Sequence, residues 1–168
     1  SITTNGLVKA SSGNGILAQS NASNADGITI VNNGGIQVSG GTGIFAVRNV
    51  GSGDVVITSN GAISSGTGGA GTLGTGILAA TNPGANGNVI VNLNADIGSA
   101  TDVATGTGIS ATSGGSNNLG NIDVNVTKAS IFAVGNGINA QMFGKGNVTI
   151  TGTGAGTISS ANGTGISA

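Results

Sequence analysis

The pattern Thr42-Gly43-Ile44-Phe45-Ala46 is one of six related copies along this 168-residue sequence. Every copy keeps Gly, then Ile, then a variable residue, then Ala, and has Asn or Thr before the Gly. The other copies begin at Gly15, Gly76, Gly108, Gly137 and Gly165. The glycines of neighbouring copies are 28 to 33 residues apart. A repeat of this length indicates one structural unit stacked several times.

Two more aliphatic segments recur between these copies. One alternates in the manner of Ile28-Thr29-Ile30, and it returns as Val55-Val56-Ile57, Val89-Ile90-Val91, Ile122-Asp123-Val124 and Val148-Thr149-Ile150. The other is a single aliphatic position, occupied by Ile36, Ile63, Ile97, Ile131 and Ile158, and Ile2 and Val8 open the chain in the same frame. Period-two alternation over short segments predicts strands, and corners such as Asn33-Gly34 predict turns.

These strands define a fold class. A unit of three short strands and three turns cannot bury its own apolar face, so each strand must pair with its counterpart in the next repeat. The sequence therefore predicts an all-β protein, a right-handed parallel β-helix with three sides and about five and a half coils of roughly 30 residues. A left-handed hexapeptide helix is the alternative, but no six-residue period is present. We expect a single domain over residues 1–168.

The composition agrees with this architecture. Stacked coils place equivalent side chains about 4.8 Å apart, so aliphatic residues form ladders whereas like charges would repel each other. The chain has only nine charged residues but 35 glycines. We expect the Ile and Ala of each Gly-Ile-x-Ala copy to face inward. We also expect Gly and Asn to supply left-handed backbone conformations at the corners.

The same composition argues against most chemistry. The sequence has no His, Cys, Trp or Tyr, and its net charge is -1. It therefore lacks a proton shuttle, a thiol nucleophile, the usual zinc ligands and a basic patch for nucleic acid. Asp96 and Asp102 are the only close carboxylates, and we interpret them as solvated turn residues beside an insertion. The sequence predicts no enzyme activity, no cofactor, no metal site, no nucleic-acid partner and no membrane span in this segment.

Variation in repeat length locates two surface excursions. The spacing from the third strand to the next Gly-Ile-x-Ala copy is longest in the third and fourth repeats. We therefore expect insertions at residues 66–74 and 100–106.

One outward-facing feature stands out. The variable residue of the first three Gly-Ile-x-Ala copies is Leu17, Phe45 and Leu78, whereas the later copies have Ser110, Asn139 and Ser167. Three adjacent coils should therefore expose a strip of apolar side chains, and exposed contiguous apolar surface marks contact sites. We interpret Leu17, Phe45 and Leu78 as a partner-contact strip. The alternative is that a neighbouring loop covers it.

The Gly-Ile-x-Ala copies, together with elements such as Gly53-Asp54-Val55 and Asn60-Gly61, resemble the passenger domains of Gram-negative autotransporters, which are type V secreted surface proteins. The resemblance covers essentially the whole chain. It implies an extracellular location on the bacterial cell surface, a β-helical stalk, and adhesion to a host or bacterial surface or self-association. It also implies that the chain is a slice of a longer repetitive passenger.

Two other readings stay open at this point. The chain could be a non-catalytic segment of a β-helical carbohydrate-active enzyme or of a tailspike-like protein. It could also be a self-stacking fibre subunit, because the ends of a coil expose strand edges that invite head-to-tail stacking.

Overall fold

A computed structural model describes residues 1–66 and 72–168. These residues form seventeen short strands and no helix, so none of them belongs to a helix that could cross a bilayer. All strand pairs between named strands are parallel, and they assemble into three sheets along the chain.

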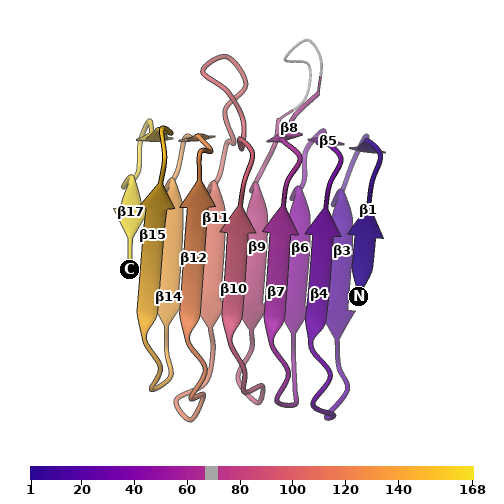
Figure 1. Cartoon of the computed structure of the whole chain (residues 1–168), viewed down its shortest axis with the longest axis vertical. Coiled ribbons are helices and arrows are strands. Elements are labelled where there is room, and N and C mark those ends of the chain that lie inside the picture. The colour runs from indigo at the N-terminus through magenta and orange to yellow at the C-terminus, as the bar shows by residue number, and fades with distance from the viewer. Residues whose placement is uncertain (67–71) are drawn as a thin grey trace.

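The two large sheets have six strands each and lie one behind the other in Figure 1. Sheet A is nearer the viewer, and it contains β1 (Ile2–Thr4), β4 (Ile28–Asn32), β7 (Val55–Ser59), β10 (Val89–Leu93), β12 (Ile122–Thr127) and β15 (Val148–Thr153). Sheet C lies behind it, and it contains β3 (Ile16–Ser20), β6 (Ile44–Arg48), β9 (Ile77–Thr81), β11 (Ile109–Ser113), β14 (Ile138–Met142) and β17 (Ile166–Ser167).

Sheet B is a narrow third side along the upper edge in Figure 1. Its strands are β2 (Val8–Ala10), β5 (Ile36–Val38), β8 (Ile63–Ser64), β13 (Ile131–Ala133) and β16 (Ile158–Ser160). Ile97 joins the two groups, because it forms parallel bridges with both Ile63 and Ile131. The predicted third-strand position therefore forms one ladder across all six coils.

The chain winds as a right-handed solenoid. It ascends a strand of sheet A, crosses the upper edge through sheet B and descends behind in sheet C, each time one step closer to the C-terminus (Figure 1). This path completes six turns, whereas the sequence periodicity predicts about five and a half. The right-handed parallel β-helix predicted from the repeats is confirmed.

The core follows the predicted register. In sheet C the isoleucines of the Gly-Ile-x-Ala copies pair coil to coil, and so do the alanines two residues later, as in Ile44 with Ile77 and Ala46 with Ala79. These four side chains have no exposed surface. A bulky row beside a small row lets the two large sheets approach each other across a narrow interior.

Close packing, more than backbone conformation, explains why the motif begins with Gly. A Cβ added to Gly76 would lie 2.5 Å from Ile97 Cγ2 and 2.5 Å from the carbonyl oxygen of Gly108. Four of the equivalent glycines meet the same isoleucine position of sheet B: Gly15, Gly43, Gly108 and Gly137. The motif Gly therefore makes room for the sheet B side chain of the following coil.

The prediction about corner conformations is wrong in part. Eight described glycines have positive φ, but the only other described residue with positive φ is Lys128, at 53°, and no described Asn has one. Many corner glycines have ordinary φ values and are required because the neighbouring coil passes too close for a Cβ. For example, a Cβ on Gly74 would lie 2.8 Å from the carbonyl oxygen of Gly41.

Asn residues have a different role at one corner, where they form a ladder. Asn33 Nδ2 donates to Asn5 Oδ1 at 2.9 Å, Asn60 donates to Asn33 at 2.8 Å, and Asn94 donates to Asn60 at 2.8 Å. The side chains stack along the solenoid and link four consecutive coils. Asn is therefore used at this corner for its amide rather than for a left-handed backbone.

The two predicted insertions need correcting. Leu73 and Ala104 lie inside the ranges 66–74 and 100–106, yet both are fully buried. The Leu73 carbonyl accepts a hydrogen bond from the Thr105 N–H at 2.7 Å, and Ala104 bridges Ala133 in sheet B. The excursions therefore interrupt the third strand and return to it, instead of following it. Residues 67–71 of the first insertion lie outside the described part of the chain.

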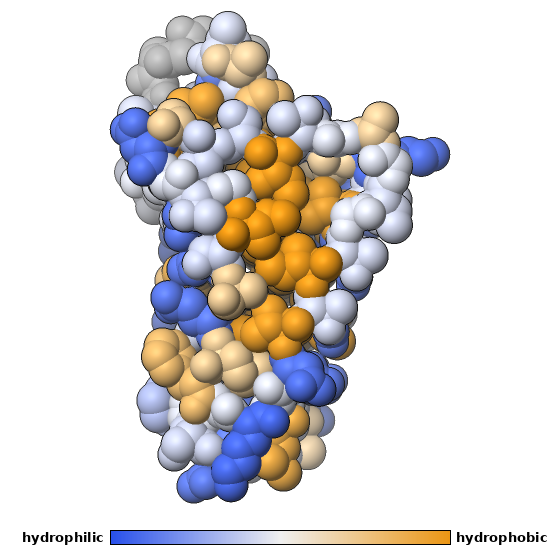
Figure 2. Space-filling view, turned by 90° about the vertical axis from the view of Figure 1, so that its left-hand side faces the viewer, coloured by the Kyte–Doolittle hydropathy of each residue, from blue (hydrophilic) through white to orange (hydrophobic). Residues whose placement is uncertain are grey.

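Figure 2 shows the end of the solenoid that carries β15 and β17. A band of apolar side chains is framed by polar ones. The inward residues of this coil, among them Ile150 and Ile158, are partly buried and pack against the core, and Ile166 is 47% exposed. The core is thus a continuous aliphatic column that runs the length of the solenoid.

Candidate functional site

The predicted contact strip is aligned as expected. Leu17 on β3 pairs with Phe45 on β6, and Phe45 pairs with Leu78 on β9. All three occupy outward positions of sheet C, between the inward Ile and Ala of their strands. Leu17 is 54% exposed, whereas Phe45 and Leu78 are half-buried. The three side chains span two strand spacings, about 10 Å.

A second row of apolar residues lies beside these three but is nearly buried. The next outward row of sheet C pairs Gln19 with Val47 and Val47 with Ala80. Val47 and Ala80 are only 6% and 8% exposed although they point away from the interior. The alternation of β6 and β9 could have identified them, because each lies two residues after the strip residue of its own strand. We define the apolar strip from here on as Leu17, Phe45 and Leu78; Val47 and Ala80 pack beside it and add almost no accessible surface.

The face that carries the strip has no charged side chain on its described strands. Arg48 is the only charged residue within the six strands of sheet C, and it is fully buried. Its guanidinium donates to the backbone carbonyl groups of Asn24 and Asp26, which fixes the corner that precedes β4. The outer surface of sheet C therefore presents apolar groups at one end and neutral polar groups, such as Ser110 and Asn139, at the other.

The two candidate carboxylates are not brought together as a catalytic pair. Asp96 Oδ1 accepts a hydrogen bond from the Ser130 N–H at 2.6 Å. Asp102 accepts from the Ser65 N–H at 2.9 Å and also from the Ser65 hydroxyl. Each carboxylate therefore secures a turn of its own. Within residues 1–66 and 72–168, the structure has no group of three His, Cys, Asp or Glu that could hold a metal ion.

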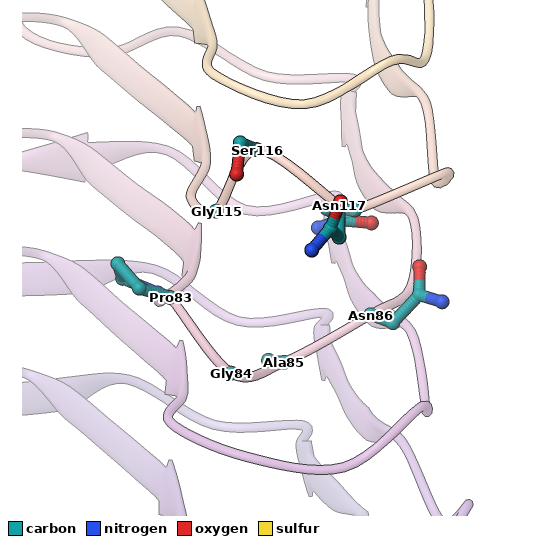
Figure 3. A pocket seen from close by; sticks show the side chains of 8 residues that line it. Pro83, Gly84, Ala85, Asn86, Gly115, Ser116 and Asn117 are labelled. Atoms are coloured by element: carbon teal, nitrogen blue, oxygen red, sulfur yellow. The ribbon is translucent and has the colours of Figure 1, made fainter.

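The structure forms a pocket that the sequence did not single out. It is an open hollow of about 560 Å³ between segments 83–86 and 115–118, which are corner turns of consecutive coils (Figure 3). In the lower turn the Ala85 N–H donates to the Asn82 carbonyl at 2.9 Å, and Gly84 has a φ of 103°. Pro followed by a Gly of positive φ is the signature of a type II turn.

The upper turn is also closed by a hydrogen bond across four residues, but its third residue, Asn117, does not have a positive φ, so it is not a type II turn. Its Asn118 N–H donates to the Gly115 carbonyl at 3.0 Å. The sequence Asn82-Pro83-Gly84 could have predicted the lower turn. It could not predict the pocket, because the pocket depends on the distance between two turns that are far apart in the chain.

Comparisons of this chain with protein-family models, with curated proteins and with solved structures found no match. The class of protein is therefore defined by the fold alone, a right-handed parallel β-helix.

Proposed function

We propose that this chain is a segment of a non-enzymatic stalk on the bacterial cell surface and that it mediates adhesion or self-association. The observation that carries the proposal is the apolar strip on an uncharged sheet face. Apolar side chains in register on a rigid surface mark a contact site. Four other large apolar side chains are exposed in the described part of the chain, but none of them pairs with another across a sheet: Leu7, Leu119, Phe143 and Ile166. The surface location rests on the sequence resemblance to autotransporter passengers.

The solenoid suits a stalk for a mechanical reason. Parallel strands pair in every coil, and side-chain ladders such as the one through Asn33 and Asn60 reinforce the corners. A repeat protein of this kind holds its outer residues at fixed spacings, so a partner meets a preorganised surface and loses less entropy on binding.

An attachment assay tests the proposal. Beads coated with the chain should cluster with each other or attach to bacterial or host cells. Phe45→Asp should reduce attachment at least tenfold, because it places a charge in the middle of the apolar contact. Ser110→Asp is the matched control, since it adds the same charge to the same column two coils from Phe45, at the polar end of the face.

Leu17→Asp provides a second variant, because Leu17 is the most exposed member of the strip and its replacement should leave the fold intact. Circular dichroism should show the same β-structure for all variants. If folded Phe45→Asp and Leu17→Asp beads still attach normally, the strip is not the contact surface and the proposal fails.

A further inference from the structure

The pocket between the turns 82–85 and 115–118 presents neutral hydrogen-bonding groups that the fold does not use. Ser116 and Asn117 line it from the upper turn and Asn86 from the lower one (Figure 3). Within the described chain, the side chains of Ser116 and Asn117 form no hydrogen bond, and both residues are exposed. Asn86 uses only its Oδ1, which accepts from the Leu119 N–H at 3.0 Å, so its NH₂ group remains free to donate.

The walls of the pocket are held in place by a buried side chain. Asn118 is 2% exposed, and its Nδ2 donates to Thr81 Oγ1 at 2.9 Å. Its Oδ1 accepts from the N–H groups of Gly87 and Gly120 at 3.2 and 2.8 Å. One side chain thus connects the upper turn to the end of β9 and to the segment that follows the lower turn. The pocket is therefore preformed, and its volume lies within the usual range for small-ligand sites.

The chemistry of the lining selects the charge of the ligand. No charged residue lines the pocket, so an anion would find no cation to pair with and a cation would find no carboxylate. Pro83 and Ala85 add a small apolar surface beside the amides and the hydroxyl. A fitting ligand is therefore neutral, carries several groups that both donate and accept hydrogen bonds, and has some exposed C–H surface.

An extended peptide does not fit this description. Peptides that dock on β-proteins add a strand to a free edge through main-chain hydrogen bonds. Here both walls of the pocket are tight turns rather than strands with a free edge. The Ala85 and Asn118 N–H groups close these turns, and the Asn86 N–H donates to the Gly51 carbonyl at 2.6 Å. The walls therefore offer separate polar groups instead of a main-chain ladder, which favours a ligand rich in hydroxyl groups over an extended peptide.

We propose that this pocket binds a neutral saccharide unit, with the amides of Asn86 and Asn117 and the hydroxyl of Ser116 bonded to its hydroxyl groups. The site is separate from the apolar strip and goes beyond the proposed adhesive function. Aromatic stacking is absent from the lining, so the dissociation constant should be on the order of 1 mM or weaker.

Nuclear magnetic resonance titration of the whole chain tests the proposal. Maltose, lactose and cellobiose are added separately, each up to about 50 mM, to saturate a millimolar site. At least one of them should shift the backbone signals of Gly84 and Gly115 and the side-chain amide signals of Asn86 and Asn117. Asn117→Ala should weaken this binding about threefold to tenfold, which corresponds to one neutral hydrogen bond. Ser116→Ala together with Asn117→Ala should weaken it further.

Matched controls separate this site from non-specific effects and from the strip. Asn162→Ala removes an exposed amide at another corner and should leave binding unchanged, and Phe45→Asp should do the same because it lies outside the pocket. Glycerol at the same hydroxyl concentration should not reproduce the shifts. The proposal is overturned if no neutral sugar shifts these signals, if glycerol gives the same shifts, or if glucuronic acid binds more tightly than the neutral sugars.

Discussion

At the scale of single residues, packing requires Gly at the start of each Gly-Ile-x-Ala copy that has a following coil. The side chain of the sheet B isoleucine in the following coil occupies the place where a Cβ would lie. A substitution there must displace either that isoleucine or the backbone of the neighbouring coil, and both belong to the core.

Gly76→Ala should therefore lower the free energy of unfolding by about 1 to 3 kcal/mol, the usual cost of overpacking. Gly152→Ala is the control, because a Cβ at that position would meet no atom within 4 Å and Gly152 does not have a positive φ. It should be neutral or stabilise the fold by about 0.4 to 1 kcal/mol. Urea denaturation measures both variants, and equal losses would show that the sheet B isoleucine is not the reason for the motif glycine.

Replacing either of two buried serines by alanine should have opposite effects on stability. Ser59 Oγ donates to the Gly61 carbonyl at 3.0 Å and accepts from Asn32 Nδ2 at 3.1 Å. Ser113 Oγ, in contrast, has no hydrogen-bond partner among residues 1–66 and 72–168. Ser59→Ala should cost about 1 kcal/mol or more because it breaks a satisfied buried network. Ser113→Ala should be neutral or stabilising, because it removes a hydroxyl that is desolvated without compensation. Thermal melting of the two variants against the wild type checks the signs, and a destabilised Ser113→Ala would contradict the assignment.

At the scale of elements, each sheet C strand has two faces. The Ile and Ala of its Gly-Ile-x-Ala copy point inward, and the residue between them points outward. The inward alanines leave space for only a methyl group between the large sheets, and Ala79 has no exposed surface. The outward position on the next coil is Ser110, which is partly exposed.

Ala79→Leu should therefore destabilise the protein by about 1 to 3 kcal/mol, whereas Ser110→Leu should be nearly neutral. Denaturant midpoints of the two variants provide the comparison, since both add a leucine to the same sheet. If the two losses were the same, the inward and outward faces would be wrongly assigned.

The strand positions could be predicted from the sequence because each coil repeats the same physical constraints. Ile16, Ile44 and their counterparts recur in register, so a single repeat predicts the rest. The insertions were harder to place, because Leu73 and Ala104 return to sheet B after excursions that break the spacing. A longer repeat shows that residues have been inserted, but it does not show which of them belong to the strand and which to the loop.

The candidate site also has features that the sequence predicts and features that it does not. The alignment of Leu17, Phe45 and Leu78 follows from the repeat, since equivalent positions stack. The burial of Arg48 does not follow from any repeat, because no other coil has a charged residue at that position. The pocket at Pro83 and Asn117 could not be predicted either, because it depends on how two turns on neighbouring coils lie relative to each other.

At the scale of the whole molecule, the proposed adhesive function requires that the apolar end and the polar end of the same uncharged face behave differently. Gln19 and Gln141 are a matched pair for this test. Both are exposed and occupy the same outward row of sheet C, but Gln19 lies beside the apolar strip and Gln141 is four strand spacings away, about 19 Å. Because the chain contains no cysteine, Gln19→Cys or Gln141→Cys each introduces a single labelling site.

The most direct measurement is the solvent accessibility of a spin label at each position, by electron paramagnetic resonance, before and after the chain associates with itself or with cells. Association through the strip should lower the accessibility of the label at position 19 at least severalfold and leave the label at position 141 unchanged. Equal protection of both labels, or protection at position 141 alone, would contradict a contact surface formed by Leu17, Phe45 and Leu78.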